Sequence, residues 1–298
     1  MKRVLSSLAI ACVLLQTARP VCHAQSEVDA DTFRALGPKT LLSWGVVPAQ
    51  PEEEEEDDRL VTDRPHFSEA SSLVGLGTVQ VETGYSIFRD SSRGTVVTTH
   101  SFPEPLLRMG VFAEWFEFRL AYNYLVQPTT DPLLGNRRLS GSDDLYVAAK
   151  FALAEQAAFL PEVALFPQLR VPTGGRDFTS GQVMPGFNLA YSWKINSLLE
   201  LECNTQMNRR VDDANHFYTE FIQTANMEYD ISRRLGAFTE WLCFVPSGAL
   251  VARTQHYFHA GFVFFVTPNI QLDIHSAVGL NDAADNLAFT GGGLSIRF

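Results

Sequence analysis

Residues 287–298 read LAFTGGGLSIRF, and the sequence ends on the aromatic side chain of Phe298. Because side chains alternate between the two faces of a strand, Leu294 and Ile296 fall on the same face as Phe298. A glycine, a serine and an arginine fall on the opposite face. The stretch predicts an amphipathic final strand, which is either half-buried in a soluble sheet or the closing strand of a membrane β-barrel. The rest of the sequence decides between these two interpretations.

The same alternation recurs along most of the chain. Phe116 and Phe118, for example, alternate with Glu117 and Arg119. Strands are expected at 78–88, 98–111, 115–124, 145–153, 160–173, 183–193, 198–208, 216–230, 234–245, 255–266, 270–280 and 287–298. Repetition of one amphipathic unit along this length predicts a sheet whose two faces meet different surroundings.

The connections between these twelve segments alternate in length. Short turns are expected at 112–114, 154–159, 194–197, 231–233 and 267–269. Longer connections, richer in Gly, Pro, Asp and Asn, are expected at 89–96, 127–142, 174–182, 209–215, 246–254 and 280–286. Outer-membrane barrels have short periplasmic turns and long external loops. We therefore expect an all-β, transmembrane, antiparallel up-and-down barrel over residues 78–298, with both ends on the periplasmic side.

A soluble β-sandwich or a lipocalin-like barrel is the alternative. Strands of soluble proteins average about five to six residues, and most of the segments expected here are longer. Their polar face carries ionisable groups, which a water-excluded core does not tolerate unpaired. Two features fit a membrane barrel less well: Pro167 falls inside a strand, and the segments 234–245 and 255–266 are apolar on both faces.

Residues 1–24 have the composition of a cleaved secretory signal. Two basic residues precede an apolar run at 5–15, which is too short to cross a bilayer as a helix. Small residues at Cys22 and Ala24 predict cleavage before Gln25. A lipoprotein-type site at Cys12 is a weaker alternative, because it would truncate the apolar run. Export followed by barrel formation predicts the outer membrane of a Gram-negative-type bacterium, with membrane lipid and the barrel-assembly machinery as partners.

The charge of the chain excludes one class of function. The formal net charge is −11, and without the signal 20 basic and 34 acidic residues remain, a net charge of −14. Such an acidic chain is not expected to bind nucleic acid. Two cysteines remain, Cys203 and Cys243, and we expect both to be free buried thiols, with a disulfide as the alternative.

Residues 25–77 form an N-terminal arm with two distinct parts. The seven consecutive carboxylates of 52–58 repel one another and predict a solvated spacer; what role the run has stays open. The segment 63–69 instead mixes opposite charges, one proline and one aromatic residue. We expect it to fold into or against the periplasmic mouth, where it can reach lumen charges such as Arg108 and Arg119. The candidates for this plug are Asp63, Arg64, Phe67 and Glu69.

Several short motifs follow one another from the arm to the C-terminus. They are DRPHFSE at 63–69, VQVETGY at 79–85, PLLRMG at 105–110, FEFRL at 116–120, DL at 144–145 and VPTG at 171–174. Together with the glycine-rich final strand, they resemble an outer-membrane transporter family linked to the meta-pathway of phenol degradation. His66 stands where the resemblance implies an acidic residue. The resemblance implies a barrel without catalytic chemistry and suggests hydrophobic or aromatic solutes.

No motif for catalysis or cofactor binding occurs. The sequence lacks HExxH, CxxC, phosphate-loop and dinucleotide patterns. His256 and His259 are three apart on a strand and thus on opposite faces, so we expect no metal site and no cofactor. A lipid-acting outer-membrane enzyme would need a Ser–His pair, but the adjacent His275 and Ser276 also point to opposite faces. We therefore expect no enzyme, and a non-transporting structural barrel stays open beside a channel.

Twelve strands enclose a lumen between that of filled eight-stranded barrels and that of open porins. This predicts a narrow or plugged channel for a small molecule that the sequence does not identify. The candidate lumen-lining residues are Glu82, Arg108, Glu117, Arg119, Lys150, Arg170, Glu200, Glu202, Glu228, Glu240, Asp273, His275 and Arg297. Most basic members fall on early strands and most acidic members on later ones, which predicts a transverse field that selects solutes. The alternative is that these charges pair and seal the lumen.

Overall fold

The computed structural model describes residues 38–45, 58–92, 94–212, 216–284 and 287–298. The signal segment 1–24 and most of the acidic run lie outside the described residues. None of the described residues belongs to a helix long and apolar enough to cross a membrane. The strands are β1 (Val79–Ser92), β2 (Thr95–Phe102), β3 (Leu106–Gly110), β4 (Phe116–Ala121), β5 (Tyr124–Asp131), β6 (Gly135–Ser142), β7 (Leu145–Ala154), β8 (Glu162–Val171), β9 (Met184–Asn196), β10 (Leu199–Val211), β11 (Phe217–Ser232), β12 (Leu235–Ser247), β13 (Gln255–Thr267), β14 (Ile270–Gly279) and β15 (Leu287–Arg297).

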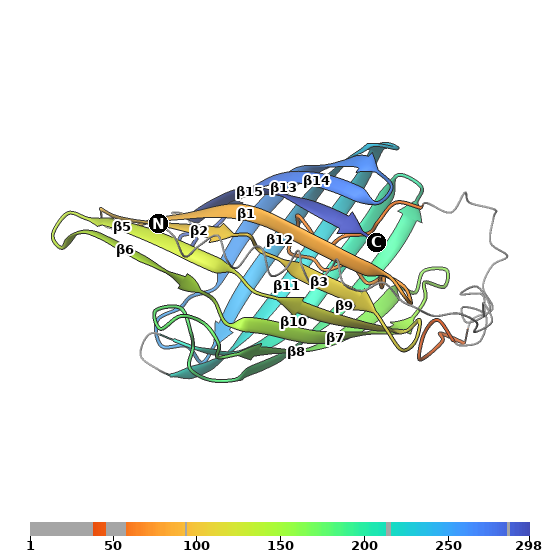
Figure 1. Ribbon diagram of the computed structural model, residues 1–298, viewed down its shortest axis with the longest axis horizontal. Helices are drawn as coiled ribbons and strands as arrows, with labels where there is room; N and C mark the ends of the chain where they lie inside the picture. Colours follow the sequence, from red (N-terminus) through yellow and green to blue (C-terminus); the bar gives the residue numbers. More distant parts are fainter. Residues whose placement is uncertain (1–37, 46–57, 93, 213–215, 285–286) are drawn as a thin grey trace, which may run out of the picture. The chain divides into compact units, whose positions relative to one another are not determined.

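These strands form one closed antiparallel barrel (Figure 1). Closure is made by β15 and β1, which pair from Gln80↔Arg297 to Asp90↔Leu287. Three walls of the barrel are each broken into two strands, β2 with β3, β4 with β5, and β6 with β7. In the first of these walls, for example, β2 and β3 both pair with β1 on one side, and on the other side β2 pairs with β5 and β3 with β4. Counted as walls, the described strands number twelve, which confirms the expected architecture.

Two expected loops are strands instead. The connections placed at 89–96 and 127–142 were wrong, because β1 and β2 pair as far as Ser92↔Thr95 and β5 and β6 pair as far as Asp131↔Gly135. These hairpins extend past the ends of the other strands, with β5 and β6 at the left of Figure 1. Outside the bilayer a strand needs no apolar face, so the alternation that marks a membrane strand is lost there.

The two faces of the barrel differ as the alternation predicts. The outward face exposes large apolar side chains on most walls, among them Tyr85, Phe187, Phe221, Trp241, Phe258, Phe262, Phe264 and Ile274. Inward-facing polar side chains are buried instead, among them Gln80, Glu82, Arg108, Glu117, Arg119, Lys150, Asn204, Thr224, Glu240 and Gln271. Glu240 and His259 are both fully buried and register against each other, which sets the orientation of the two apolar segments on β12 and β13.

Pro167 occupies a gap in the pairing of β8. The register between β7 and β8 runs from Leu145↔Val171 to Ala148↔Gln168 and resumes at Phe151↔Leu165, so Pro167 has no registered partner in β7. Its side chain is exposed on the outer face. Since proline lacks a backbone N–H, it is accommodated where the ladder is already interrupted.

Candidate functional site: the lumen and its plug segment

Residues 60–76, here called the plug segment, run between the walls of the barrel without forming a strand. Their backbone N–H groups are bound by wall carboxylates. Glu82 accepts from the N–H groups of Asp63 at 3.1 Å and Arg64 at 3.0 Å, and Glu240 accepts from Phe67 at 2.9 Å and Ser68 at 2.6 Å. A buried backbone needs such partners when no sheet supplies them. The inward carboxylates therefore serve as docking points for this one segment.

Asp63 is the centre of the basic side of the lumen. Its Oδ2 lies 3.3 Å from Nη1 of Arg108 and also pairs with Nη2 of Arg119. The two guanidinium groups come from β3 and β4, where Arg108 and Arg119 are registered partners. Burial alone would raise the pKa of Asp63, but the Arg108 and Arg119 charges outweigh it and hold that pKa well below its usual range. Without Asp63, two like charges would face each other across neighbouring strands.

Lys150 extends this contact toward the next part of the plug segment. Its Nζ donates to the carbonyl oxygen of Ala70 at 2.8 Å and to that of Ser72. The ammonium and the guanidinium of Arg119 each lie 4.9 Å from the ring centre of Phe166. A cation over an aromatic face is stabilised most where it is desolvated, as here.

Arg64 fills a slot that two glycines leave open. Gly84 on β1 and Gly293 on β15 are registered partners, and a Cβ at either position would collide with the Arg64 side chain. The guanidinium reaches Glu104 at 3.0 Å and Asp273 at 3.3 Å. The glycines of the closing strand thus have a packing role, since they let an arginine of the plug segment lie against the wall.

Phe67 packs into an aromatic group beside a chain of hydrogen-bonding rings. Its ring centre lies 5.5 Å from that of Phe289 and 6.0 Å from that of His259. His259 Nδ1 lies 2.8 Å from Glu240 Oε2, and His259 Nε2 lies 2.9 Å from Nδ1 of His275. The plug segment is therefore held by apolar packing as well as by charge.

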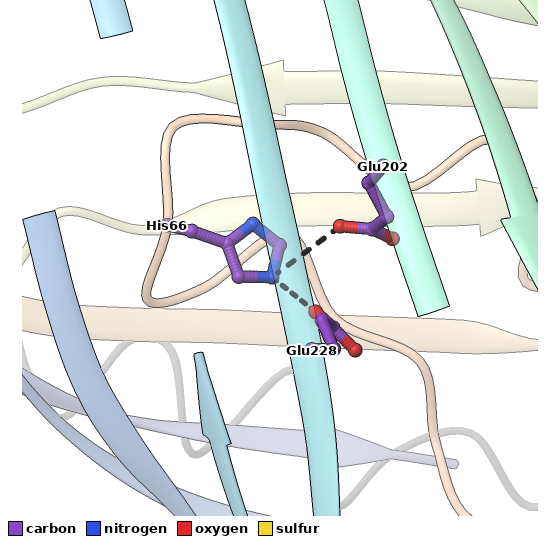
Figure 2. A group of neighbouring side chains, drawn as sticks. All are labelled: His66, Glu202 and Glu228. Carbon is purple, nitrogen blue, oxygen red and sulfur yellow. Dashed lines mark ion pairs between the residues drawn. The ribbon is translucent and has the colours of Figure 1, made fainter. Parts of the chain in front are cut away.

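His66 contacts the acidic side of the lumen (Figure 2). Its Nε2 lies 2.7 Å from Glu228 on β11 and 3.7 Å from Glu202 on β10. Burial would lower the pKa of His66, but the Glu202 and Glu228 carboxylates raise it well above its usual value. The two carboxylates therefore favour the cationic form of the ring.

The plug segment is bordered by separate cavities toward the two ends of the barrel. Toward the long loops lie cavities of about 280 Å³ and about 200 Å³, both lined by Phe67, Tyr146 and Arg170. Toward the short turns lie cavities of about 580 Å³ and about 240 Å³, both lined by Arg59 and Val61. The segment thus stands between an outer and an inner set of spaces.

The lumen candidates fall into two groups by their contacts. Those that bind the plug segment are Glu82, Arg108, Glu117, Arg119, Lys150, Glu202, Glu228, Glu240 and Asp273. The other four lie elsewhere: Arg170 pairs with Asp143, Glu200 lines the 240 Å³ cavity, His275 contacts His259, and Arg297 pairs with Asp58. Arg108 and Arg119 thus pair with carboxylates of the plug segment in this structure.

Several residues that hold the plug segment were not expected. Asn204 binds both the N–H and the carbonyl of Glu69, at 2.7 Å and 2.9 Å, and Ser71 reaches Glu162 at 3.0 Å. Alternation puts Asn204 on the inward face of its strand, but a neutral side chain gave no signal among the charges. Cys203 and Cys243 are free thiols, as expected; Cys243 is buried as expected, but Cys203 is only half-buried.

A closed barrel with an apolar outer face, buried charges within and twelve antiparallel walls is an outer-membrane β-barrel protein. The sequence model described as "Putative MetA-pathway of phenol degradation" matches residues 62–298, and the chain belongs to this family. The family that the short motifs indicated is thereby confirmed. The match begins inside the plug segment, which is thus part of the shared sequence.

The fold is similar to that of a solved outer-membrane channel. The COG4313 outer membrane channel from Pseudomonas putida F1 is similar with a TM-score of 0.60 at 12% identity, over 76% of this chain and 98% of that one. The transport unit of the autotransporter AIDA-I from Escherichia coli also matches, with a TM-score of 0.48 at 10% identity, over 74% of this chain and 91% of that one. At such identities the likeness extends to the fold alone. The sequence has no significant match among curated proteins.

Proposed function

We propose that this protein is an outer-membrane channel for small solutes and that residues 60–76 close its lumen. The exported chain, residues 25–298, then consists of an arm, residues 25–77, and a barrel, residues 78–298. The observation that carries it is the position of the plug segment between two sets of cavities, held by side chains from both sides of the barrel. A barrel with a purely structural role has no need of a polar lumen whose charges are matched to a segment outside its walls.

Hydrophobic or aromatic molecules are the solutes that we propose. The description of the family refers to phenol degradation. The cavities toward the long loops present Phe67, Phe244 and Tyr146 beside charged groups. Ring faces next to hydrogen-bonding side chains suit a small aromatic compound that carries a polar group.

Two deletions test whether the plug segment closes the lumen. One lacks residues 25–77 and the other, its control, lacks only 25–57 and keeps the plug segment. Both are refolded and compared with the exported chain by liposome swelling in small sugars and in phenolic solutes. We expect the longer deletion alone to raise the swelling rate, because it alone opens a path between the cavities. Equal rates for the two deletions would contradict the proposal.

The same preparations distinguish the alternatives. A structural barrel gives no swelling for any variant. A lipid-acting enzyme releases fatty acid from phospholipid, and we expect no release above that of a heat-denatured sample.

We also propose that the final strand is recognised by the barrel-assembly machinery. Phe298 donates its N–H to the carbonyl oxygen of Val79 at 2.8 Å, yet the residue is 74% exposed and buries little surface. Deleting Phe298 should reduce the amount of protein assembled in the outer membrane while leaving the denaturation midpoint of the refolded barrel within a few degrees. Undiminished assembly, measured by protease accessibility of the long loops in cells, would contradict this role.

A further inference from the structure

Three side chains from distant parts of the chain converge at the inner end of the lumen. Figure 2 shows His66 of the plug segment facing Glu202 of β10 and Glu228 of β11. The ring Nε2 and one carboxylate oxygen of each glutamate all lie within 4.8 Å of one another. Donors around a tetrahedral Zn²⁺ stand about 3.3 Å apart when the bonds are about 2.0–2.1 Å. Side-chain movements of up to about 1.5 Å would bring these atoms to that spacing.

The other nitrogen of His66 is already fixed as metal-binding histidines require. Nδ1 donates its hydrogen to the backbone carbonyl of Ser68, with 2.5 Å between the two atoms. A histidine that binds a metal usually donates its second N–H to a carbonyl or carboxylate, which sets the ring orientation and leaves the first nitrogen free to coordinate. In His66 that first nitrogen is Nε2, the atom that faces both glutamates.

Asn226 supplies an independent observation at the same place. Its Oδ1 is buried and has no hydrogen-bond partner among the residues that the structure describes. Its amide nitrogen lies 3.2 Å from Glu202 Oε2 and 3.4 Å from Glu228 Oε1. An amide can rotate by half a turn at little steric cost. Rotation would place the unsatisfied oxygen of Asn226 beside the two carboxylates, where a cation would bind it.

The site can be reached from water, and its charge favours a cation. The side chains of His66 and Glu202 are 3% and 4% exposed, whereas that of Glu228 is 40% exposed and borders a cavity of about 240 Å³. Glu200 registers against Glu228 and adds a third carboxylate, while Arg59 and Lys194 line the same cavity. The acidic groups are closest to the histidine, so the local field at its Nε2 is negative.

We propose that His66, Glu202 and Glu228 bind a divalent transition-metal ion of the Zn²⁺ class, with Asn226 as a further oxygen donor. Imidazole nitrogen selects Zn²⁺ and similar ions over Mg²⁺ and Ca²⁺, which prefer oxygen alone. The ion would join the plug segment to two neighbouring strands. It would also replace the proton on Nε2 as the positive charge between the two carboxylates. This site is independent of whether solutes pass through the barrel.

Zinc binding to the refolded exported chain tests the proposal. The cysteines are first replaced, Cys203→Ser and Cys243→Ser, because thiolates also bind zinc. Zn²⁺ is then titrated in competition with a chromogenic chelator, and Mg²⁺ serves as the ion that should not compete. We compare His66→Gln and Glu228→Gln with Glu220→Gln. Glu220 is the matched control, because it lies on the same strand as Glu228 but pairs with Arg210 at 3.2 Å.

We expect one zinc ion per chain, with the affinity at least tenfold weaker in both His66→Gln and Glu228→Gln and unchanged in Glu220→Gln. The absence of stoichiometric binding would overturn the proposal, and so would equal affinity in all three variants. Refolding is checked by circular dichroism and by gel migration with and without heating. If His66→Gln does not refold, Glu228→Gln decides alone, since its half-exposed side chain tolerates the exchange.

Discussion

Replacing Asp63 by asparagine should release the plug segment. The change removes the carboxylate that two buried guanidinium groups share, and breaking a buried ion pair costs about 3–5 kcal/mol. Arg108 keeps Glu117 at 2.9 Å and Arg119 keeps Glu69 at 3.1 Å, so the lower limit applies. About 3 kcal/mol corresponds to roughly a hundredfold change in the equilibrium between the docked and released segment.

Single-channel recording in planar bilayers measures this change as the fraction of time that the lumen conducts. Asp63→Asn should raise that fraction roughly a hundredfold over the exported chain, until it saturates. Asp143→Asn is the control, because the pair of Asp143 with Arg170 is partly exposed, at 22% and 37% for the two side chains. Such pairs contribute about 0–1 kcal/mol, so the control should change the fraction by less than about fivefold. A correctly folded Asp63→Asn barrel that conducts no more often than the control would refute this role of Asp63.

Two further outcomes follow from the same contacts. Gly84→Ala should raise the conducting fraction, because the new methyl group displaces the Arg64 guanidinium. In a barrel that already carries Arg64→Ala, the same exchange should have no effect. An equal effect in both backgrounds would show that Gly84 does not act by making room for Arg64. Docking of the plug segment should also weaken in acid, because docking lowers the pKa of Asp63. The stabilisation that Asp63 gives to the docked segment is fully present above the pKa of a free aspartate, about 3.9, and is lost as pH falls toward the lower pKa of the docked state. The conducting fraction should therefore rise as the pH falls from 5 to below about 4. A rise of the same size in Asp63→Asn would show that another group titrates.

The barrel could be predicted because its signal is local. One face of each membrane strand lies against lipid and the other faces the lumen. The adjacent residues Phe116 and Glu117 are therefore enough to indicate which face is which. The glycine-rich final strand likewise indicated from its own sequence that it closes the barrel. The hairpins of β1 with β2 and β5 with β6 were missed, because their outer parts are free of that constraint and their sequences resemble loops.

The sequence indicated which residues form the plug segment but not most of the wall residues that they contact. Opposite charges around Pro65 marked it as different from the acidic spacer, and Arg108 and Arg119 were inferred to be within its reach. The structure brings Asp63 to both of them. The contacts of Arg64, however, depend on two glycines that pair across the closure, and no spacing along the chain indicates such a pair. His66 is a similar case, since its partners lie on β10 and β11, more than a hundred residues away.

A removable covalent link between plug segment and wall tests the central claim most directly. The hydroxyl oxygens of Ser71 and Ser192 are 2.8 Å apart, so Ser71→Cys with Ser192→Cys can form a disulfide once the two native cysteines are replaced by serine. We place this pair in the Asp63→Asn barrel and record conductance before and after reduction. The oxidised barrel should remain closed, like the exported chain, and should conduct when dithiothreitol is added. Conductance that is the same in the oxidised and the reduced barrel would contradict the claim that this segment closes the lumen.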